Sequence, residues 1–345
     1  MQSSTKFRRL AAFLPAIVLL GSLSLSLYDP LTIATSLSER TFDLYQQIKP
    51  RASGAQKAVY IDIGEESAAR YGSWPWTRMR LAELVRATRK AGAKTILLDM
   101  PLPGADVTSP REALKLWAPL PANVNVTGLA AGLAELPDHD ILLSEALRAG
   151  PSIVTVIPGK GAAESIAGTV PGFSESGGNP VRYAPHYDSW SSTLGRVARG
   201  ASGIGLGLPS QRTANTIRTL PMLAQLDGQL VPATALEALR VDQGQTGYKV
   251  HVSIPNSAFL VTEPTGITGL AFDGETSKIN TYGDGSLRLY FRSRAQQSTY
   301  EAWRILDEAT SLDFNGKIAV IGFSVNGAEK TYDTVAGPLS SGAIV

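Results

Sequence analysis

Two aspartates, Asp62 and Asp99, each stand near the end of a short apolar run that is typical of a buried strand. Open α/β sheets bind ligands outside the carboxyl ends of their strands, so two carboxylates would meet there if the strands are neighbours. Ser67 and Arg78 follow the first run closely. These residues are candidates for a recognition pocket that binds a cation or an amine-bearing ligand. The two runs are residues 58–63 (AVYIDI) and 95–100 (TILLDM).

The same acids have a structural alternative, in which they cap the following turns or pair with Arg78 to fix the fold. Trp74 and Trp76 flank Pro75, and they also have two interpretations. Aromatic pairs line many ligand pockets, so both tryptophans join the candidate ligand-binding residues. They suit the packing of a corner between a strand and a helix equally well. The sequence leaves both alternatives open.

Catalytic and cofactor-binding motifs find little support in this chain. The absence of cysteine excludes thiolate metal sites and cysteine nucleophiles. The glycine run 203–207 lacks the strand-then-helix context of a dinucleotide loop, and residues 322–326 lack the second glycine of a nucleophile elbow. We therefore expect no catalytic residue, no metal ligand and no cofactor. The three histidines are far apart in the sequence, at His139, His186 and His251.

Strands and helices alternate in the first half of the chain. After the run at 58–63, Thr77 can cap a helix with an apolar stripe, and Gly92 suits its end. Strand, helix and strand in this order indicate right-handed βαβ units with parallel pairing. The sequence therefore predicts an α/β fold with a mixed, largely parallel sheet flanked by helices. The later elements of this half are a strand at 95–100, a helix at 140–149 and a strand at 152–157.

The second half of the chain predicts β-hairpin insertions in this fold. Residues 220–231 around Asp227-Gly228 indicate one hairpin, and residues 279–292 around Gly283-Asp284-Gly285 indicate another. Two segments rich in Pro, Gly, Ala or Ser, 101–137 and 158–200, are expected to be long loops. The remaining expected elements are helices at 111–117, 233–240 and 301–309 and strands at 248–254 and 317–322.

An uncharged run from Leu10 to Tyr28 follows basic residues near the N-terminus. It is close to the roughly 20 residues that cross a bilayer as a helix, and its basic side is expected to stay in the cytoplasm. The alternative is a cleaved signal peptide with an apolar core at 10–20. Either way, the remainder is exported. The expected organisation is a cytoplasmic tail at 1–9, a transmembrane anchor at 10–28, a stalk helix and linker at 29–57, and an extracytoplasmic α/β domain at 58–345.

The stalk places several side chains on one helical face, and no coiled-coil heptads are recognised in it. The face consists of Leu37, Thr41, Leu44, Tyr45 and Ile48. The net charge of the whole chain is +2, and its basic residues are scattered. No strong field therefore favours a nucleic-acid partner.

Four stretches of the chain, in order, resemble the CHASE type 2 sensory domain, the second type of cyclase- and histidine-kinase-associated sensory extracellular domain. The Trp-Pro-Trp-Thr-Arg element in its strand–turn–helix context is the most specific of them. A departure is Thr213-Ala214-Asn215-Thr216, where the family usually has Asp-Gly. The four stretches are residues 39–43 (ERTFD), 62–78 with the element at 74–78, 91–99, and 316–322 (GKIAVIG) with Asp333 and Gly337-Pro338 beyond.

The resemblance implies a non-catalytic sensory domain of a bacterial receptor in the inner membrane, with its bulk in the periplasm or outside the cell. An unknown small molecule, ion or protein is its expected stimulus. The signal would pass through the anchor helix to a cytoplasmic cyclase or kinase that this chain lacks. Because such outputs generally work as dimers, a homodimer is expected. The C-terminal end is expected to be truncated. The alternatives are an exported metal-dependent hydrolase using Asp62 and Asp99, and an envelope interaction module without a diffusible ligand.

Overall fold

The computed structural model describes residues 15–16, 18–21, 33–50, 56–117, 127–159, 166–208, 216–253, 266–291, 298–325, 331–340 and 344. The chain divides into two units, residues 1–52 with 290–292, and residues 53–289 with 293–345. Most of the predicted anchor at 10–28 lies outside the described residues. Within the described ranges, no helix has both the length and the apolar character needed to cross a membrane.

Helix α2 (Ile33–Ile48) belongs to the first unit and corresponds to the predicted stalk helix. Its Phe42 ring meets the ring of Tyr290 edge-on, with 5.4 Å between the centroids. The side-chain oxygen of Gln46 accepts a hydrogen bond of 2.9 Å from the backbone N–H of Phe291. One face of α2 is therefore packed against a segment that lies far along the chain.

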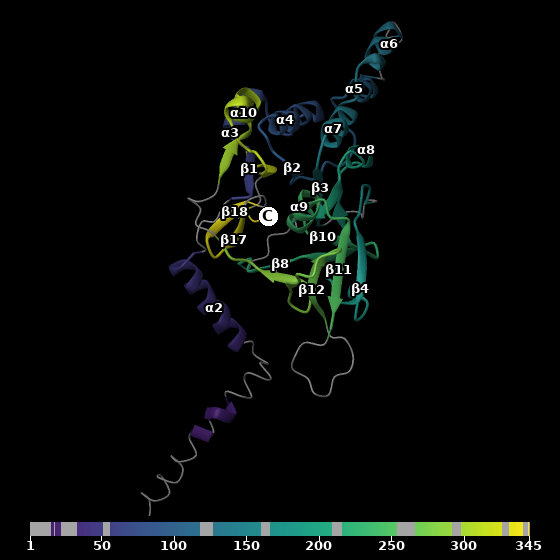
Figure 1. Ribbon diagram of the computed structural model, residues 1–345. Coiled ribbons are helices and arrows are strands. Elements are labelled where there is room, and N and C mark those ends of the chain that lie inside the picture. The colour runs from purple at the N-terminus through teal and green to yellow at the C-terminus, as the bar shows by residue number, and fades with distance from the viewer. Residues whose placement is uncertain are drawn as a thin grey trace, which may run out of the picture. The chain divides into compact units, whose positions relative to one another are not determined.

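The second unit contains a seven-stranded sheet, counted over the described residues, in the order β15-β1-β16-β2-β3-β6, with β7 also paired to β3 (Figure 1). Its pairings are parallel, except the one between β3 and β6. This sheet confirms the predicted α/β class. The strands are β1 (Ala58–Ile63), β2 (Thr95–Leu98), β3 (Ser152–Pro158), β6 (Trp190–Ser191), β7 (Gly203–Leu206), β15 (Thr299–Glu301) and β16 (Ile318–Phe323).

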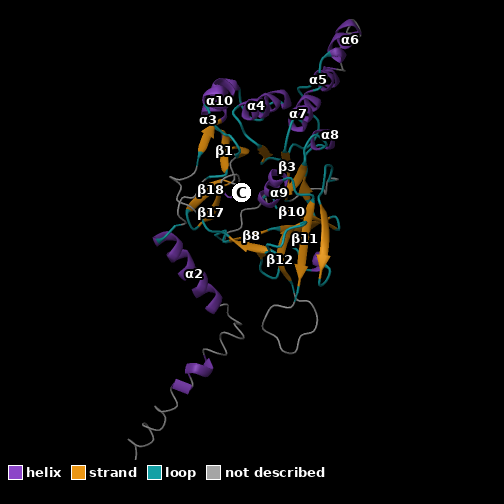
Figure 2. Cartoon of the chain, in the orientation of Figure 1, coloured by secondary structure: helices purple, strands orange, loops and turns teal. Residues whose placement is uncertain are grey.

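Helices pack on both faces of this sheet (Figure 2). On one face, Leu84 of α4 (Arg78–Lys90) and Leu147 of α7 (His139–Arg148) share a core with Ile61. On the other face, Ala238 of α9 (Thr234–Gln243) packs with Leu97. The predicted cap of α4 is confirmed, because the Thr77 hydroxyl accepts a hydrogen bond from the Arg80 N–H at 3.1 Å. The first face also carries α3 (Glu65–Tyr71), α8 (Gly195–Ala198) and α10 (Ala302–Glu308).

Smaller sheets accompany the main sheet and build a second core around Tyr248. The hairpin of β9 and β10 turns at Asp227 and Gly228, both of which have positive φ, as the sequence predicts. The strands of these sheets are β4 (Gly172–Ser176), β5 (His186–Tyr187), β8 (Thr219–Pro221), β9 (Leu223–Leu226), β10 (Gln229–Pro232), β11 (Gly247–Val252), β12 (Ile267–Phe272), β13 (Ile279–Asn280), β14 (Ser286–Arg288), β17 (Thr331–Thr334) and β18 (Gly337–Ser340).

Three details differ from the sequence-based expectations. Strand β16 lies between β1 and β2, so these two strands are not neighbours. The hairpin at 279–292 is wrong, because β13 pairs with β12 whereas β14 pairs with β8. Both expected long loops contain regular elements. Segment 101–137 holds two helices, α5 (Pro110–Trp117), which matches the predicted patch, and α6 (Thr127–Glu135), and segment 158–200 holds β4, β5, β6 and α8. Pairings between distant segments decide the first two points, and local patterns do not contain them.

Candidate functional site

The insertion of β16 places Asp62 and Asp99 on either side of Gly322. Asp62 is in register with Gly322, and the Asp99 N–H donates to the Ile321 carbonyl at 2.9 Å. Neighbouring residues of parallel strands project to the same face, and Ile61 and Ile321 face the α4 side. Both acids therefore belong to the opposite face of the sheet. With about 4.8 Å between adjacent strands, their backbones lie roughly 10 Å apart. We call Asp62 and Asp99 the carboxyl-edge acids.

Hydroxyl groups and small residues surround the Asp62 half of this edge. The Ser324 hydroxyl donates to Asp62 Oδ2 at 2.5 Å. A Cβ atom added at Gly322 would lie 2.6 Å from the Tyr60 hydroxyl oxygen. The tip of the Tyr60 side chain therefore occupies the place that a side chain at position 322 would take. Asp62 as a residue is half-buried, and its Oδ1 atom lies in the buried part.

The Asp99 half of the edge is more enclosed than the Asp62 half, because Asp99 is only 6% exposed. A Cβ atom added at Gly207 would lie 3.7 Å from Asp99 Oδ1 and 2.6 Å from Thr155. Strand β17 brings Tyr332 into the same region. Burial, with the negative charge of Asp99, raises the pKa of Tyr332 to about 12. The Tyr332 hydroxyl therefore stays protonated beside this carboxylate at neutral pH.

Three other predicted residues lie at the same end of the sheet or in its core. The Ser67 hydroxyl is buried, donates to Glu301 Oε2 at 2.5 Å and accepts from the Trp303 N–H at 3.1 Å. Trp74 stacks on Phe323, with 4.5 Å between the ring centroids. Trp76 is buried in the main core, and its indole N–H donates to the Gly72 carbonyl at 2.8 Å. The contacts of Ser67 and Trp76 are those of packed residues, whereas Trp74 is half-buried at the strand ends.

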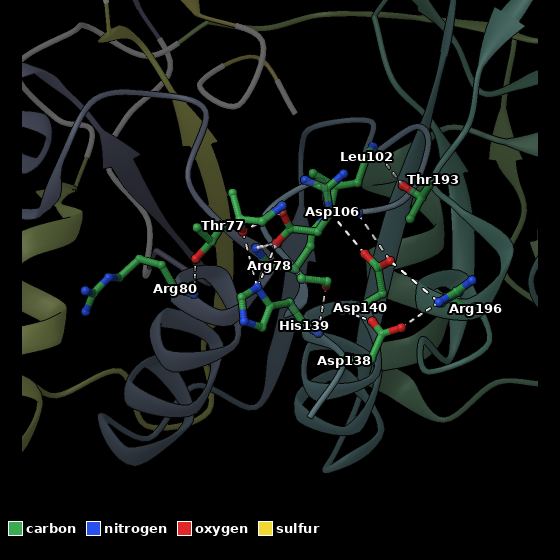
Figure 3. Close-up of polar contacts among 12 residues, drawn as sticks. Thr77, Arg78, Arg80, Leu102, Asp106, Asp138, His139, Asp140, Thr193 and Arg196 are labelled. Atoms are coloured by element: carbon green, nitrogen blue, oxygen red, sulfur yellow. Dashed lines mark hydrogen bonds and ion pairs between the residues drawn. The ribbon is translucent and has the colours of Figure 1, made fainter. Parts of the chain in front are cut away.

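Arg78 lies at the N-termini of α4 and α7, beside acids other than Asp62 and Asp99. Its Nε is 3.7 Å from Asp140 Oδ1, and its backbone N–H donates to Asp106 Oδ2 at 2.7 Å. Figure 3 shows this arrangement, with His139 beside Asp106 and Arg196 beside Asp138. Burial lowers the pKa of Arg78, while Asp140 and Asp106 act in the opposite direction. We call this set the helix-terminal cluster; its members are Arg78, Asp106, Asp138, His139, Asp140 and Arg196.

Asp106 is the centre of the helix-terminal cluster. Its Oδ1 accepts from both the backbone N–H and the hydroxyl of Thr108, at 2.9 and 2.7 Å. Burial acts to raise the pKa of Asp106, but the hydrogen bonds from Thr108 and Arg78, with the nearby His139, outweigh it and lower that pKa. Because the donors come from α4 and from the segment after β2, Asp106 fastens this segment to the helix. The residues expected from the sequence did not include Asp106. Its spacing of two residues to Thr108 is the only local pattern that indicates its role.

Asp140 has the opposite electrostatic balance. It is fully buried, and burial is the largest cause of its raised pKa. The N–H of Asp106 reaches its Oδ2 at 3.3 Å, and Arg196 lies 4.0 Å from the same atom. Asp138 caps α7 by accepting from the Asp140 N–H at 2.8 Å. The capping position of Asp138, just before a predicted helix, is the sequence signal that points to this part of the cluster.

Metal binding finds no ready-made site in the described part of the chain, where no three His, Asp or Glu side chains gather as a metal-ligand group. The carboxyl-edge acids instead offer two anionic groups on one sheet face, next to hydroxyl donors. Such an edge can neutralise a positively charged ligand and orient it by hydrogen bonds.

An α/β domain with its polar groups at the carboxyl edge of a parallel sheet belongs to a class of folds that bind ligands at that edge. Comparison with family models identifies the chain further. The model described as the CHASE2 domain matches residues 14–345, so this chain belongs to the CHASE2 domain family. This family comprises sensory domains of signalling receptors, which are typically extracellular and not catalytic. Searches of curated proteins and of solved structures found no match.

Proposed function

We propose that this chain is the extracytoplasmic sensor of a membrane receptor and that the carboxyl-edge acids receive its stimulus. The family match supports the sensory role. The observation that carries the assignment of the site is the placement of Asp62 and Asp99 around Gly322 on one face of the sheet. Two carboxylates at this spacing favour a ligand with positive charge. An organic amine is the simplest ligand of this kind.

Ligand binding at this edge can be coupled to the C-terminal hairpin. Tyr332 of β17 lies close enough to Asp99 for the carboxylate to affect its pKa. The backbone N–H of Ile217 also donates to the Asp333 carbonyl at 2.7 Å, which joins β17 to the segment before β8. A cation that neutralises Asp99 changes the electrostatic environment of Tyr332. A ligand shifts the population of two conformations only if it binds them differently, and this contact offers such a difference.

The proposal includes a membrane anchor at residues 10–28, with the N-terminal tail in the cytoplasm. The basic residues before this run and the acidic residues after it support that orientation. The receptor is proposed to act as a homodimer in the inner membrane, and an output domain outside this chain would read the change. Ser67, Trp74, Trp76 and Arg78 support the edge from the helix side in this proposal.

The test is thermal unfolding of the full chain in detergent with 1,5-diaminopentane, Ca²⁺ or 1,5-pentanediol. The diamine is expected to raise the midpoint, because ligands that bind the native state stabilise it by mass action. The uncharged diol is expected to have no effect. The Asp62→Asn variant should lose the response, whereas Glu112→Gln, which removes an acid from a surface ion pair of α5, should keep it. A response that Asp62→Asn leaves unchanged would remove this edge from the proposal.

A further inference from the structure

Helix α2 carries an apolar stripe whose side chains are exposed in the described part of the chain. Leu37 is 66% exposed, Leu44 is 56% exposed and Ile48 is 75% exposed. Tyr45 is exposed beside them. Single exposed apolar residues are common on protein surfaces, but a row of them on one helix marks an interaction surface.

The stripe lies opposite the face that α2 uses for its own packing. That packed face includes Phe42 and Gln46, which contact Tyr290 and Phe291. At about 100° per residue, Leu37, Leu44 and Ile48 are centred roughly 160° from Phe42 and Gln46. The helix therefore has one side for its own unit and a second, apolar side for something else.

We propose that the stripe is the contact surface with a second copy of this chain, in a parallel pair of α2 helices. The inference rests on the proposed anchor and homodimer, for which it names the interface. Leu37, Thr41, Leu44 and Ile48 follow one another at intervals of four, three and four residues, which is the alternation of d and a positions in a coiled coil. The run spans less than two full repeats, so the pattern does not stand out in the sequence.

The charges around the stripe suit a parallel self-pair. The acidic Glu39 and Asp43 lie toward the packed face, so like acids do not meet across the seam. Arg40 takes the g position and Tyr45 the following e position, which face each other between parallel helices. The guanidinium of Arg40 would then lie near the ring of the partner subunit's Tyr45, in a cation–π contact.

Because α2 is short, the proposed pairing depends on the membrane anchor. With 16 residues, α2 is too short to hold two free chains together tightly. Two copies held in one membrane by their anchors have a high effective concentration, and a short seam is then sufficient. The same anchors force both helices to run in the same direction from the membrane.

Disulfide cross-linking of the full chain in its membrane tests the seam. The chain has no cysteine, so each introduced cysteine reports only its own position. Leu37→Cys and Leu44→Cys are the seam variants, and Ser36→Cys, exposed on the same helix but away from the stripe, is the matched control. Mild oxidation is expected to give at least fivefold more linked dimer at the seam positions. Equal yields at all three positions, or no linked dimer at any of them in folded protein, would overturn the inference.

A charge introduced at the seam gives an independent measurement. Leu44→Glu should weaken self-association of the full chain in detergent at least tenfold by sedimentation, whereas Ser36→Glu, with the same new charge away from the stripe, should not. Equal effects of the two changes would contradict the seam. The thermal response to 1,5-diaminopentane separates this question from the proposed function. That response should persist in Leu44→Glu, and its absence from the unmodified chain would refute the sensory site while leaving the cross-linking result decisive for the seam.

Discussion

The carboxyl-edge acids and the helix-terminal cluster use the same residue type in different surroundings. In the cluster, Asp106 accepts hydrogen bonds from two backbone N–H groups and one hydroxyl, and Asp140 lies beside two arginines. At the edge, Asp62 and Asp99 flank a glycine and lie near the hydroxyl groups of serine and tyrosine. Donors fixed by the backbone hold a carboxylate in place for the fold, whereas hydroxyl groups can rotate when a ligand arrives.

This difference separates a structural role from a recognition role. Loss of a cluster acid should reduce the free energy of unfolding, because its part-buried donors are left without their acceptor. Loss of an edge acid should mainly reduce binding.

The largest effect is expected for Asp106→Ala. This change leaves the part-buried N–H groups of Arg78 and Thr108 without their acceptor, and a lost hydrogen bond of this kind costs about 1 kcal/mol, so we expect a loss of about 2 kcal/mol in the free energy of unfolding. Urea unfolding followed by circular dichroism measures it. Glu145→Ala, on the exposed side of α7, is the control and should change stability by less than about 0.5 kcal/mol. Equal stability of the two variants would contradict the structural role of Asp106.

Two glycines differ in what an added side chain would meet. A Cβ atom at Gly205 would lie 2.6 Å from the Thr234 Cα, so Gly205→Ala must displace the start of α9 and should cost about 2 kcal/mol. A Cβ atom at Gly322 meets the tip of the Tyr60 side chain, which can rotate away. Gly322→Ala should therefore cost less than about 1 kcal/mol, yet weaken the diamine response. Chemical unfolding and thermal shift of the same samples test both statements, and the reverse order of stability would refute them.

The smallest effect concerns Tyr332, which connects the edge to β17. Its pKa of about 12 is above the unfolded value of about 10, so its stabilising contribution is complete below pH 10 and is lost as the pH rises toward 12. At pH 11 the loss is about 1.4 kcal/mol. Tyr332→Phe should remove this part of the alkaline decline, although other buried tyrosines contribute to it as well. Unfolding curves between pH 8 and 11.5 measure the difference, and parallel declines in both proteins would contradict the enclosure of Tyr332 beside Asp99.

Much of the fold follows from local patterns in the sequence. The run 58–63 is β1, the Thr77 cap begins α4, and Asp227-Gly228 turns the hairpin of β9 and β10. These features depend on residues that are close in the chain, such as an alternation of side chains or a capping hydroxyl. They could be predicted because the physical cause and the observed element occupy the same short segment.

The site could be predicted only in part, because its geometry depends on strand order. Asp62 and Asp99 were recognised at strand ends, but the placement of Gly322 between them comes from the pairing of β16, more than 200 residues further along. Arg78 was expected near these acids, and it lies beside Asp106 and Asp140. Asp106 is in a segment without periodicity, so no local pattern revealed its contacts.

A double-mutant cycle at the carboxyl edge tests directly whether Asp62 and Asp99 form one recognition site. Calorimetric titration of the full chain with 1,5-diaminopentane would compare the unmodified chain, Asp62→Asn, Asp99→Asn and the double variant. If both carboxylates bind one ligand, each single change should weaken binding at least tenfold, about 1.4 kcal/mol, and the double change should weaken it further. Binding that survives both changes, or a single change that leaves binding unaltered, would show that the two acids do not form one recognition site.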